Sequence, residues 1–364
     1  GLRFEGSGGS PSSDSTLVVD GCKLIDNIGY GAYLDDIHVL TINNTSVEGA
    51  ALTSKDGWCC FDLVDFHFTN NYINVPNWGI YISDGNFDAT PASNSSLINN
   101  FIISSTDEPL YTFDFENVNI WYNTFYTGGD AFAYGAYFGD PVNLDIRNNI
   151  FYAVDGHALY SADDLNTTAG TTVIDNNIYN SENNAVLVYN TLSNQYADLA
   201  AWQTANSSYN VNSLQGNPVF VNAGSDLHLA GSLADGAAVP IAAVTTDFDG
   251  DTRDATTPDI GADEYTPASC LPASGLAQSI AYADSVLVVW SDNNVGSNFT
   301  LEYGAPGFIP GSGTTVTAIT DTFYMVTGLM SNTDYEFYVT ADCGTNGTAT
   351  QAGPAPFRTA IAGP

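Results

Sequence analysis

Apolar and polar residues alternate along short runs of this chain, and most of these runs end in the same polar phrase. The clearest case is residues 144–152, where Leu-Asp-Ile-Arg is followed by Asn-Asn and then by Ile-Phe-Tyr. Alternation with a period of two is typical of a β-strand with one buried face. The anchor asparagines stand 27, 29, 23, 26 and 28 residues apart, at Asn44, Asn71, Asn100, Asn123, Asn149 and Asn177.

A period of this length with short strands inside it predicts a solenoid. A second phrase follows each anchor, usually a small residue before an apolar-aromatic pair, as in Gly-Ile-Tyr-Ile at 79–82. Asparagine suits the corners of such coils, because it tolerates left-handed backbone angles and its amide can bond along the stack. We therefore expect an all-β fold, a right-handed parallel β-helix. A β-sandwich also has closely spaced strands, but it does not explain the registered asparagines.

The repeat predicts a β-helix over residues 1–215. Its coils run from about 17 to 189, with inserted loops at 84–96, 127–141 and 161–171. One helical stretch is expected at 196–205. No amphipathic helix covers the N-terminal coil, which predicts that upstream residues or another molecule cover this end. The opening Gly-Leu-Arg-Phe is typical of the interior of a domain, so we expect a mature or truncated product.

Residues 216–269 carry two more short strands, 217–222 and 226–229, and two acidic signatures. These are Gly-Asp-Thr-Arg at 250–253 and Asp-Ile-Gly-Ala-Asp-Glu at 259–264. The stretch resembles the terminal module of secreted bacterial right-handed β-helix proteins, such as those of Bacteroidetes. The resemblance implies a module or cap that ends the β-helix. In it we expect Arg253 to pair with Glu264 or Asp263.

The pattern changes again over residues 270–364. Trp290 ends the apolar run Val-Leu-Val-Val-Trp at 286–290, and Tyr335 stands in Thr-Asp-Tyr-Glu-Phe at 333–337. These features resemble the buried tryptophan strand and the tyrosine corner of a fibronectin type III domain, which implies a β-sandwich. Cys270 and Cys343 bracket the segment, and we expect them to form a disulfide.

The cysteines and the net charge both indicate the cellular compartment of the protein. A disulfide predicts an oxidising, extracellular setting, and Cys22 could pair with Cys59 or Cys60. The 364 residues include 41 acidic and 6 basic side chains, a net charge of −35. The negative electrostatic potential of such a chain opposes binding to nucleic acid, anionic membranes and polyanionic glycans. No apolar run reaches the length of a membrane span. We therefore expect a secreted or cell-surface protein.

An alternating acidic run raises the question of a metal. Asp247, Asp249 and Asp251 match the start of a calcium-binding loop. However, Gly250 comes too early for an EF-hand, and Pro258 occupies the place of the closing glutamate. The sequence therefore favours a structural turn, and calcium is the only cofactor that the sequence suggests.

Many β-helix proteins act on polysaccharides, so a lyase or a glycoside hydrolase is the alternative function. A lyase needs a basic residue, and the predicted β-helix offers only Arg3, Lys23, Lys55 and Arg147. Arg147 is as well explained by an ion pair with Asp145. Fragments of a hydrolase pattern occur at 35–36, 156–157 and 163–164 without a basic element. Each of the histidines at 38, 67, 157 and 228 is better explained as a surface or hydrogen-bonded residue, and we assign no catalytic residue.

Aromatic residues are abundant and several stand in or beside the expected loops: Trp58, Trp78, Tyr111, Trp121, Tyr126, Tyr134 and Tyr137. An exposed aromatic row could bind neutral sugars, although stacking inside the coils explains most of these residues. The sequence favours a structural or adhesive protein over an enzyme. We expect a rigid, acidic rod that meets surface glycans or other copies of itself, for instance as a filament subunit.

Overall fold

A computed structural model describes residues 2–5, 15–25, 29–49, 55–85, 95–163, 165, 172–191, 193–265, 270–294, 297–344 and 347–363. Most of the expected loops at 84–96 and 161–171 lies outside these ranges. The chain divides into two compact units, residues 1–266 and residues 267–364. In the described ranges, no helix is long and apolar enough to cross a membrane.

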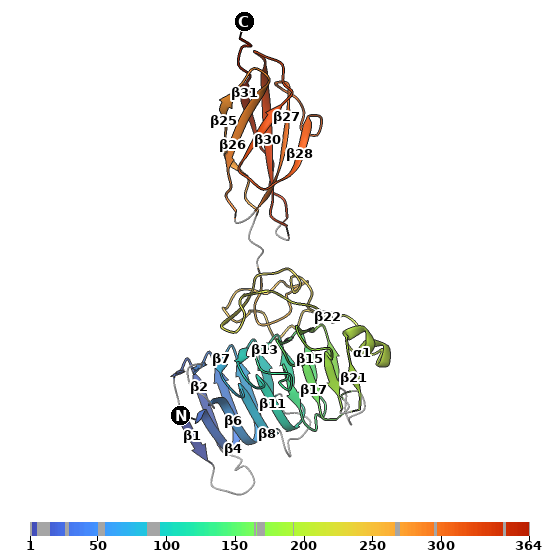
Figure 1. Cartoon of the computed structure of the whole chain (residues 1–364). Helices are drawn as coiled ribbons and strands as arrows, with labels where there is room; N and C mark the ends of the chain where they lie inside the picture. The colour runs from blue at the N-terminus through green and yellow to red at the C-terminus, as the bar shows by residue number, and fades with distance from the viewer. Residues whose placement is uncertain are drawn as a thin grey trace. The chain divides into compact units, whose positions relative to one another are not determined.

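The first unit is a stack of parallel β-coils (Figure 1). One coil consists of β11 (Leu110–Phe115), β12 (Asn119–Trp121) and β13 (Thr124–Thr127). The next consists of β14 (Tyr137–Phe138), β15 (Asp145–Arg147) and β16 (Ile150–Ala153). Each strand pairs in parallel with its counterpart in the next coil. The predicted all-β solenoid is confirmed, and one sequence repeat is one turn.

Three faces surround the core, and their strands belong to two sheets. The first face is an eight-stranded sheet of β3 (Lys23–Ile25), β5 (Ser46–Glu48), β7 (Tyr72–Val75), β10 (Phe101–Ser104), β13, β16, β19 (Ile178–Ser181) and β22 (Leu214–Gln215). The other two faces form one sheet, because β4 (Gly29–Asn43) and β6 (Lys55–Thr69) continue around the corner between them.

The remaining strands extend these two faces. The second face continues with β8 (Ile80–Gly85), β11, β14, β17 (Leu159–Ser161) and β20 (Val188–Asn190), and β21 (Gln195–Tyr196) ends it antiparallel. The third continues with β9 (Ser96–Ile98), β12, β15 and β18 (Val173–Asp175). Near the N-terminus, β1 (Leu2–Glu5) and β2 (Thr16–Asp20) pair with β4.

The C-terminal end of the coil stack is closed by α1 (Leu199–Ala205). Asp198 caps this helix by accepting a hydrogen bond from the Ala201 N–H at 2.7 Å. Leu199 and Trp202 are buried against the core. The helix predicted at 196–205 is confirmed, with a later start.

The coils turn between the third and first faces at a pair of residues, which is Tyr122 and Asn123 in one coil and polar in most others, and the two members have different tasks. The first member takes a left-handed backbone, with φ between 50° and 62° at Asn44, Asn70, Asn99, Asn148 and Asn176. The second member points inward and is buried. The sequence prediction gave both tasks to one asparagine and treated Asn44 as equivalent to the other anchors. In the structure the tasks are divided: Asn44 is the left-handed corner residue of its coil, and Thr45 occupies the inner position.

The inner column forms a continuous hydrogen-bonded ladder through Asn71, Asn100, Asn123, Asn149 and Asn177. In a representative step, Asn123 Nδ2 donates to Leu97 O at 2.8 Å and to Asn149 Oδ1 at 3.0 Å. The Asn123 backbone N–H also donates to Asn149 Oδ1, at 2.9 Å. Ser213 ends the column by accepting from the Asn177 N–H. Buried amides are therefore satisfied from coil to coil.

Residues 216–265, called the terminal module below, fold back over the outer surface of the eight-stranded face. β23 (Phe220–Asn222) and β24 (Asp226–Leu229) form a hairpin, and the rest has little regular structure. Its apolar residues pack on outward side chains of the face, including Phe101, Tyr126 and Ile150. A cap at the end of the stack was expected. The module instead covers a flank, because the outer surface of this face is apolar.

The second unit is a β-sandwich. One sheet holds β25 (Ser274–Ala281), β26 (Ser285–Ser291) and β29 (Phe323–Thr327), and the other holds β28 (Thr314–Ile319), β27 (Asn298–Gly304), β30 (Asp334–Asp342) and β31 (Ala352–Arg358). Trp290 is buried in the core. The Tyr335 hydroxyl accepts a hydrogen bond from the Met330 N–H at 3.0 Å, and its ring stacks on Phe357.

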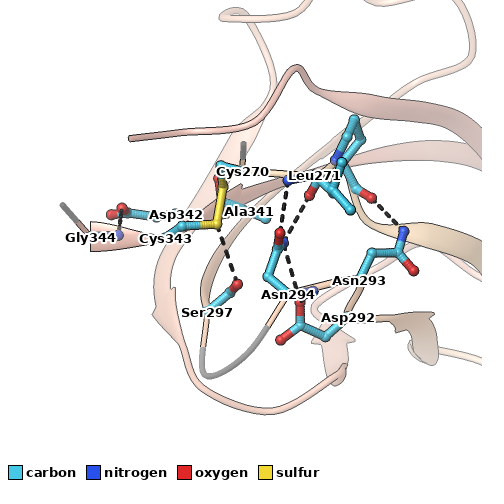
Figure 2. The surroundings of a disulfide bond; sticks show 11 residues. Cys270, Leu271, Asp292, Asn293, Asn294, Ser297, Ala341, Asp342, Cys343 and Gly344 are labelled. Carbon is cyan, nitrogen blue, oxygen red and sulfur yellow. Dashed lines mark hydrogen bonds between the residues drawn. A yellow bond between two sulfur atoms is a disulfide. The ribbon is translucent and has the colours of Figure 1, made fainter. Parts of the chain in front are cut away.

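The predicted disulfide between Cys270 and Cys343 is confirmed, with the two Cα atoms 5.8 Å apart. Figure 2 shows its surroundings, where Asn294 exchanges two hydrogen bonds with the backbone of Leu271. Closing a loop over a sequence separation of 73 contributes roughly 4 kcal/mol in the chain-entropy treatment. Cys22, Cys59 and Cys60 are free. The pairing of Cys22 with Cys59 or Cys60, which the sequence left open, is not formed: Cys59 and Cys60 lie on β6, and Cys22 precedes β3.

Candidate functional site

A column of five tyrosines runs along the outer surface of the second face. The parallel register aligns them one per coil: Tyr81 on β8, Tyr111 on β11, Tyr137 on β14, Tyr160 on β17 and Tyr189 on β20. Tyr137 lies in the expected loop 127–141, but residues 137–138 form β14. We call this column the tyrosine ladder. The alternation that points leucine and isoleucine inward points these rings outward.

The ladder rings stack on each other. Ring centroids are 5.6 Å apart between Tyr81 and Tyr111, 4.3 Å between Tyr111 and Tyr137, and 4.9 Å between Tyr137 and Tyr160. Interplanar angles in these pairs are 9–14°. Because the faces are occupied by neighbouring rings, the ladder offers ring edges and hydroxyls outward. Burial raises the pKa of Tyr137, so its phenol stays neutral and can both donate and accept.

One edge of the tyrosine ladder is lined by a column of aspartates at the next corner. Asp36, Asp62, Asp84, Asp114 and Asp140 all have left-handed backbones, with φ between 44° and 58°. Aspartate tolerates this conformation better than most residues. Burial raises the pKa of Asp114, and the charges of Asp84 and Asp140 add to that rise. The column is thus a row of carboxylates repelling each other.

The other edge of the tyrosine ladder holds a buried acid beside a tryptophan. Trp78 lies 5.3 Å from Tyr111, with the rings stacked, and its Nε1–H donates to Glu108 Oε2 at 3.0 Å. Glu108 is 5% exposed. Burial raises the pKa of Glu108 to about 9, and a hydrogen bond and charge from Asp107 add to the rise. Burial also raises the pKa of Asp56 nearby. Glu108 is therefore a neutral acid at physiological pH.

Replacing Glu108 by glutamine tests this protonation state. The folded-state pKa of about 9 lies above the ordinary value of 4.5, so folding retains a proton that the unfolded chain loses. The stability that this retained proton gives the folded state is complete below pH 4.5. As the pH rises towards 9, the free energy of unfolding falls by up to about 1.4 kcal/mol per pH unit. Glu108→Gln keeps a neutral side chain at every pH. We expect it to melt above the wild type at pH 8 and with it near pH 4.5.

The control for this measurement is Asp235→Asn, which removes an exposed carboxyl of the terminal module. Its melting temperature should follow that of the wild type across the pH range. A Glu108→Gln variant that melts below the wild type at pH 8 would contradict a protonated Glu108.

The terminal module contains most of the remaining predicted site residues. Arg253 is buried, and its guanidinium meets Glu264 Oε2 at 3.2 Å. Asp247 is also buried: its Oδ1 accepts the N–H groups of Asp249 and Asp251, and its Oδ2 accepts that of Glu264. The three aspartates therefore do not converge on one point. Asp247 builds the turn, and the Asp249 carboxylate points away towards His228.

Two of the candidate basic and hydrolase residues, Arg147 and His157, have structural contacts in the described part of the chain. Arg147 makes two hydrogen bonds to Asp145, at 2.6 and 2.5 Å, and this pair explains it as a surface residue. His157 is buried, with Nδ1 2.7 Å from Val186 O. Asp164 lies outside the described residues. Of the aromatic candidates, Trp58 is buried inside the coils, and Tyr126 is buried under the terminal module.

Comparison with known proteins decides the family. The family model described as a right handed beta helix region matches residues 7–198, just over half of the chain. The chain belongs to the right-handed β-helix family. No curated protein matches this β-helix protein.

Some solved structures resemble part of this β-helix protein. The fibronectin type III domain of human fibronectin type III domain containing protein 3 is 19% identical over 27% of this chain and 93% of its own, with a TM-score of 0.23. Titin domains A168–A170 are 24% identical over 28% of this chain and 35% of their own, with a TM-score of 0.24. Similarity at this level carries no argument about the second unit.

The tyrosine ladder was not visible as a unit in the sequence. Its members stand at unequal spacings, because the inserted loops of this β-helix protein differ in length. The signal that could have found it is the second phrase of the repeat, where a tyrosine alternates with buried apolar residues, as at Tyr81 and Tyr160. Chemically, the face can hydrogen-bond a polar polymer along its length.

Proposed function

We propose that this protein is a structural and adhesive rod of the cell surface or extracellular matrix, and that its tyrosine ladder binds neutral glycans. The observation that carries the proposal is the in-register column of tyrosines, one per coil, of which Tyr160 is buried and the other four are half-buried. Its repeating hydroxyls suit a polymer that repeats along one direction. The net charge of −35 disfavours polyanionic glycans and leaves neutral ones.

Rigidity supports the same proposal. The asparagine ladder connects successive coils, so the spacing between neighbouring tyrosines is fixed before any ligand arrives. Preorganised binding groups lose little entropy on binding. The disulfide of the second unit supports an extracellular location, because such bonds persist in oxidising compartments.

Binding to immobilised neutral polysaccharides, such as cellulose, xylan and β-1,3-glucan, tests this proposal. The decisive variant is Tyr111→Phe with Tyr137→Phe, which removes two hydroxyls and keeps the stacked rings. Each lost hydrogen bond is worth about 0.5–1.5 kcal/mol. We expect wild-type protein to bind at least one polymer, and the double variant to bind it roughly tenfold or more weakly.

The matched control is Tyr303→Phe with Tyr324→Phe, two half-buried tyrosines of the second unit. It should bind as the wild type does. Failure of the wild type to bind any neutral polymer, or equal binding by the ladder variant, would reject glycan adhesion through this face. Filaments of the unliganded protein in electron micrographs would then favour self-assembly.

A second candidate function, a carbohydrate-active enzyme, is favoured by Glu108. A carboxylic acid that stays protonated at neutral pH can act as a general acid, and Asp107 and Asp56 supply carboxylates nearby. Incubation with the same polysaccharides would release new reducing ends or unsaturated products. Turnover lost in Glu108→Gln would establish the enzyme, and absence of products from wild-type protein would remove it.

The second unit fits a spacer of the fibronectin type III class, and we include that assignment in the proposal. Its support is the buried Trp290 between a three-stranded and a four-stranded sheet, and the hydrogen bond from the Met330 N–H to the Tyr335 hydroxyl. A hydroxyl bonded to backbone a few residues upstream is the tyrosine-corner arrangement. Together with the Asp-Ile-Gly-Ala-Asp-Glu module, this points to a secreted bacterial protein.

A further inference from the structure

Three metal-ligating side chains converge in the terminal module, away from the tyrosine ladder. One ring nitrogen of His228 and one carboxylate oxygen from each of Asp249 and Asp263 lie within 4.8 Å of one another. Zn²⁺ binds such ligands at about 2.0–2.2 Å, so small side-chain movements would complete a coordination sphere. We infer that His228, Asp249 and Asp263 bind a divalent transition-metal ion, with Zn²⁺ as the best fit.

The histidine is already oriented for this role. Asp226 Oδ1 lies 2.5 Å from His228 Nδ1, and His228 Nε2 lies 2.7 Å from Asp249 Oδ2. Metal-binding histidines almost always donate their second N–H to a carboxylate or carbonyl, which fixes the tautomer and raises ligand basicity. Asp226 occupies that position. The edge-to-face contact with Phe101, at 4.9 Å between centroids, holds the ring in place.

Asp263 supplies a ligand that is nine-tenths buried, at 8% exposure. Its Oδ2 accepts the Leu229 N–H at 2.7 Å, and a carboxylate has further lone pairs for a metal ion. A carboxylate oxygen of Asp249 lies within 4.8 Å of one of Asp263. A divalent cation would relieve this crowding of negative charge.

The site is open to solvent, since the His228 and Asp249 side chains are 35% and 46% exposed. A proton competes with the metal for Nε2. Only the neutral imidazole can bind the metal, so metal affinity should rise with pH. The imidazole ligand favours Zn²⁺ over Ca²⁺, which takes oxygen ligands.

Calorimetric titration of the metal-stripped full chain with ZnCl₂ tests the inference, with Co²⁺ absorption as a second readout. We expect one ion per chain at pH 7.5, weaker binding at pH 5.5, and little binding of CaCl₂ at this site. His228→Gln should abolish the binding. Asp226→Asn should weaken it by about 10–100-fold, as loss of a second-sphere partner does.

The matched control is His67→Gln, because His67 is similarly exposed and has one carboxylate nearby, Asp65 at 3.5 Å. It should bind Zn²⁺ as the wild type does. If His228→Gln fails to fold, Asp249→Asn changes an exposed ligand and carries the same expectation. Unchanged Zn²⁺ affinity in folded His228→Gln or Asp249→Asn, or loss of binding in His67→Gln, would overturn the assignment.

Discussion

Replacing Asn149 by alanine is expected to destabilise the β-helix by about 3–5 kcal/mol. Asn149 Nδ2 donates to Ile120 O at 2.7 Å and to Asn177 Oδ1 at 3.1 Å. Its Oδ1 accepts the backbone N–H and the side-chain amide of Asn123. Alanine removes these four bonds, and a fifth from Nδ2 to Arg147 O at 3.0 Å, in a fully buried place. Each buried polar group left without a partner costs about 1–3 kcal/mol.

Calorimetry of the full chain measures this loss as a drop of the β-helix transition by roughly 6–20 °C. The matched control is Asn183→Ala, whose exposed amide bonds only to Asp155 Oδ1, at 2.8 Å. It should change stability by less than about 0.5 kcal/mol. If both variants melt together, the asparagine ladder contributes nothing beyond its backbone.

The sequence predicts the solenoid because a repeated coil repeats its chemistry. Alternation gives the strands, and the recurring Asn-Asn phrase marks the corner, so fold class follows from local pattern. The phrase does not say which asparagine turns inward. In residues 43–45 the Asn-Asn phrase begins one residue before the corner pair, which is Asn44 and Thr45. Only the pairing register between coils places Asn44 at the outer corner.

The candidate sites were harder to predict for a related reason. The tyrosine ladder depends on which residues of different coils become neighbours, and loop insertions hide that alignment. The metal ligands come from β24, from the 247–251 turn and from residue 263, which meet only because the terminal module folds back on the flank. Asp249 belongs to an acidic run that is visible in the sequence. Nothing in the sequence around His228 indicates that it would lie beside Asp249.

The way the terminal module attaches explains why a flank was covered. The left-handed corner residues point their side chains outward, where Asn148 exchanges two hydrogen bonds with the backbone of Val239. Asn99 donates to Thr246 O at 2.7 Å. The column of left-handed asparagines therefore makes two kinds of contact. In the N-terminal coils Asn44 and Asn70 bond to each other, whereas in later coils these asparagines bond to the terminal module.

Replacing Arg253 by methionine is expected to detach this module at a cost of about 3–5 kcal/mol. The Arg253 side chain is 2% exposed. Its guanidinium donates to Glu264 Oε2 at 3.2 Å and to Asn99 Oδ1 at 3.0 Å, and it lies 4.0 Å from the ring of Tyr122. Removing one partner of a buried pair leaves an uncompensated charge, here on Glu264. Hydrogen exchange should rise across residues 216–265 and remain slow in the coil core.

The control is Arg147→Met, because Arg147 also pairs with a carboxylate, that of Asp145, and lies near an aromatic ring, 5.9 Å from Trp121. Its side chain is 28% exposed, and exposed pairs are worth about 0–1 kcal/mol. Arg253→Lys should fall between the two, since lysine keeps the charge but cannot reach Glu264 and Asn99 with one planar group. Equal losses in Arg253→Met and Arg147→Met would mean that apolar packing alone holds the module on the β-helix.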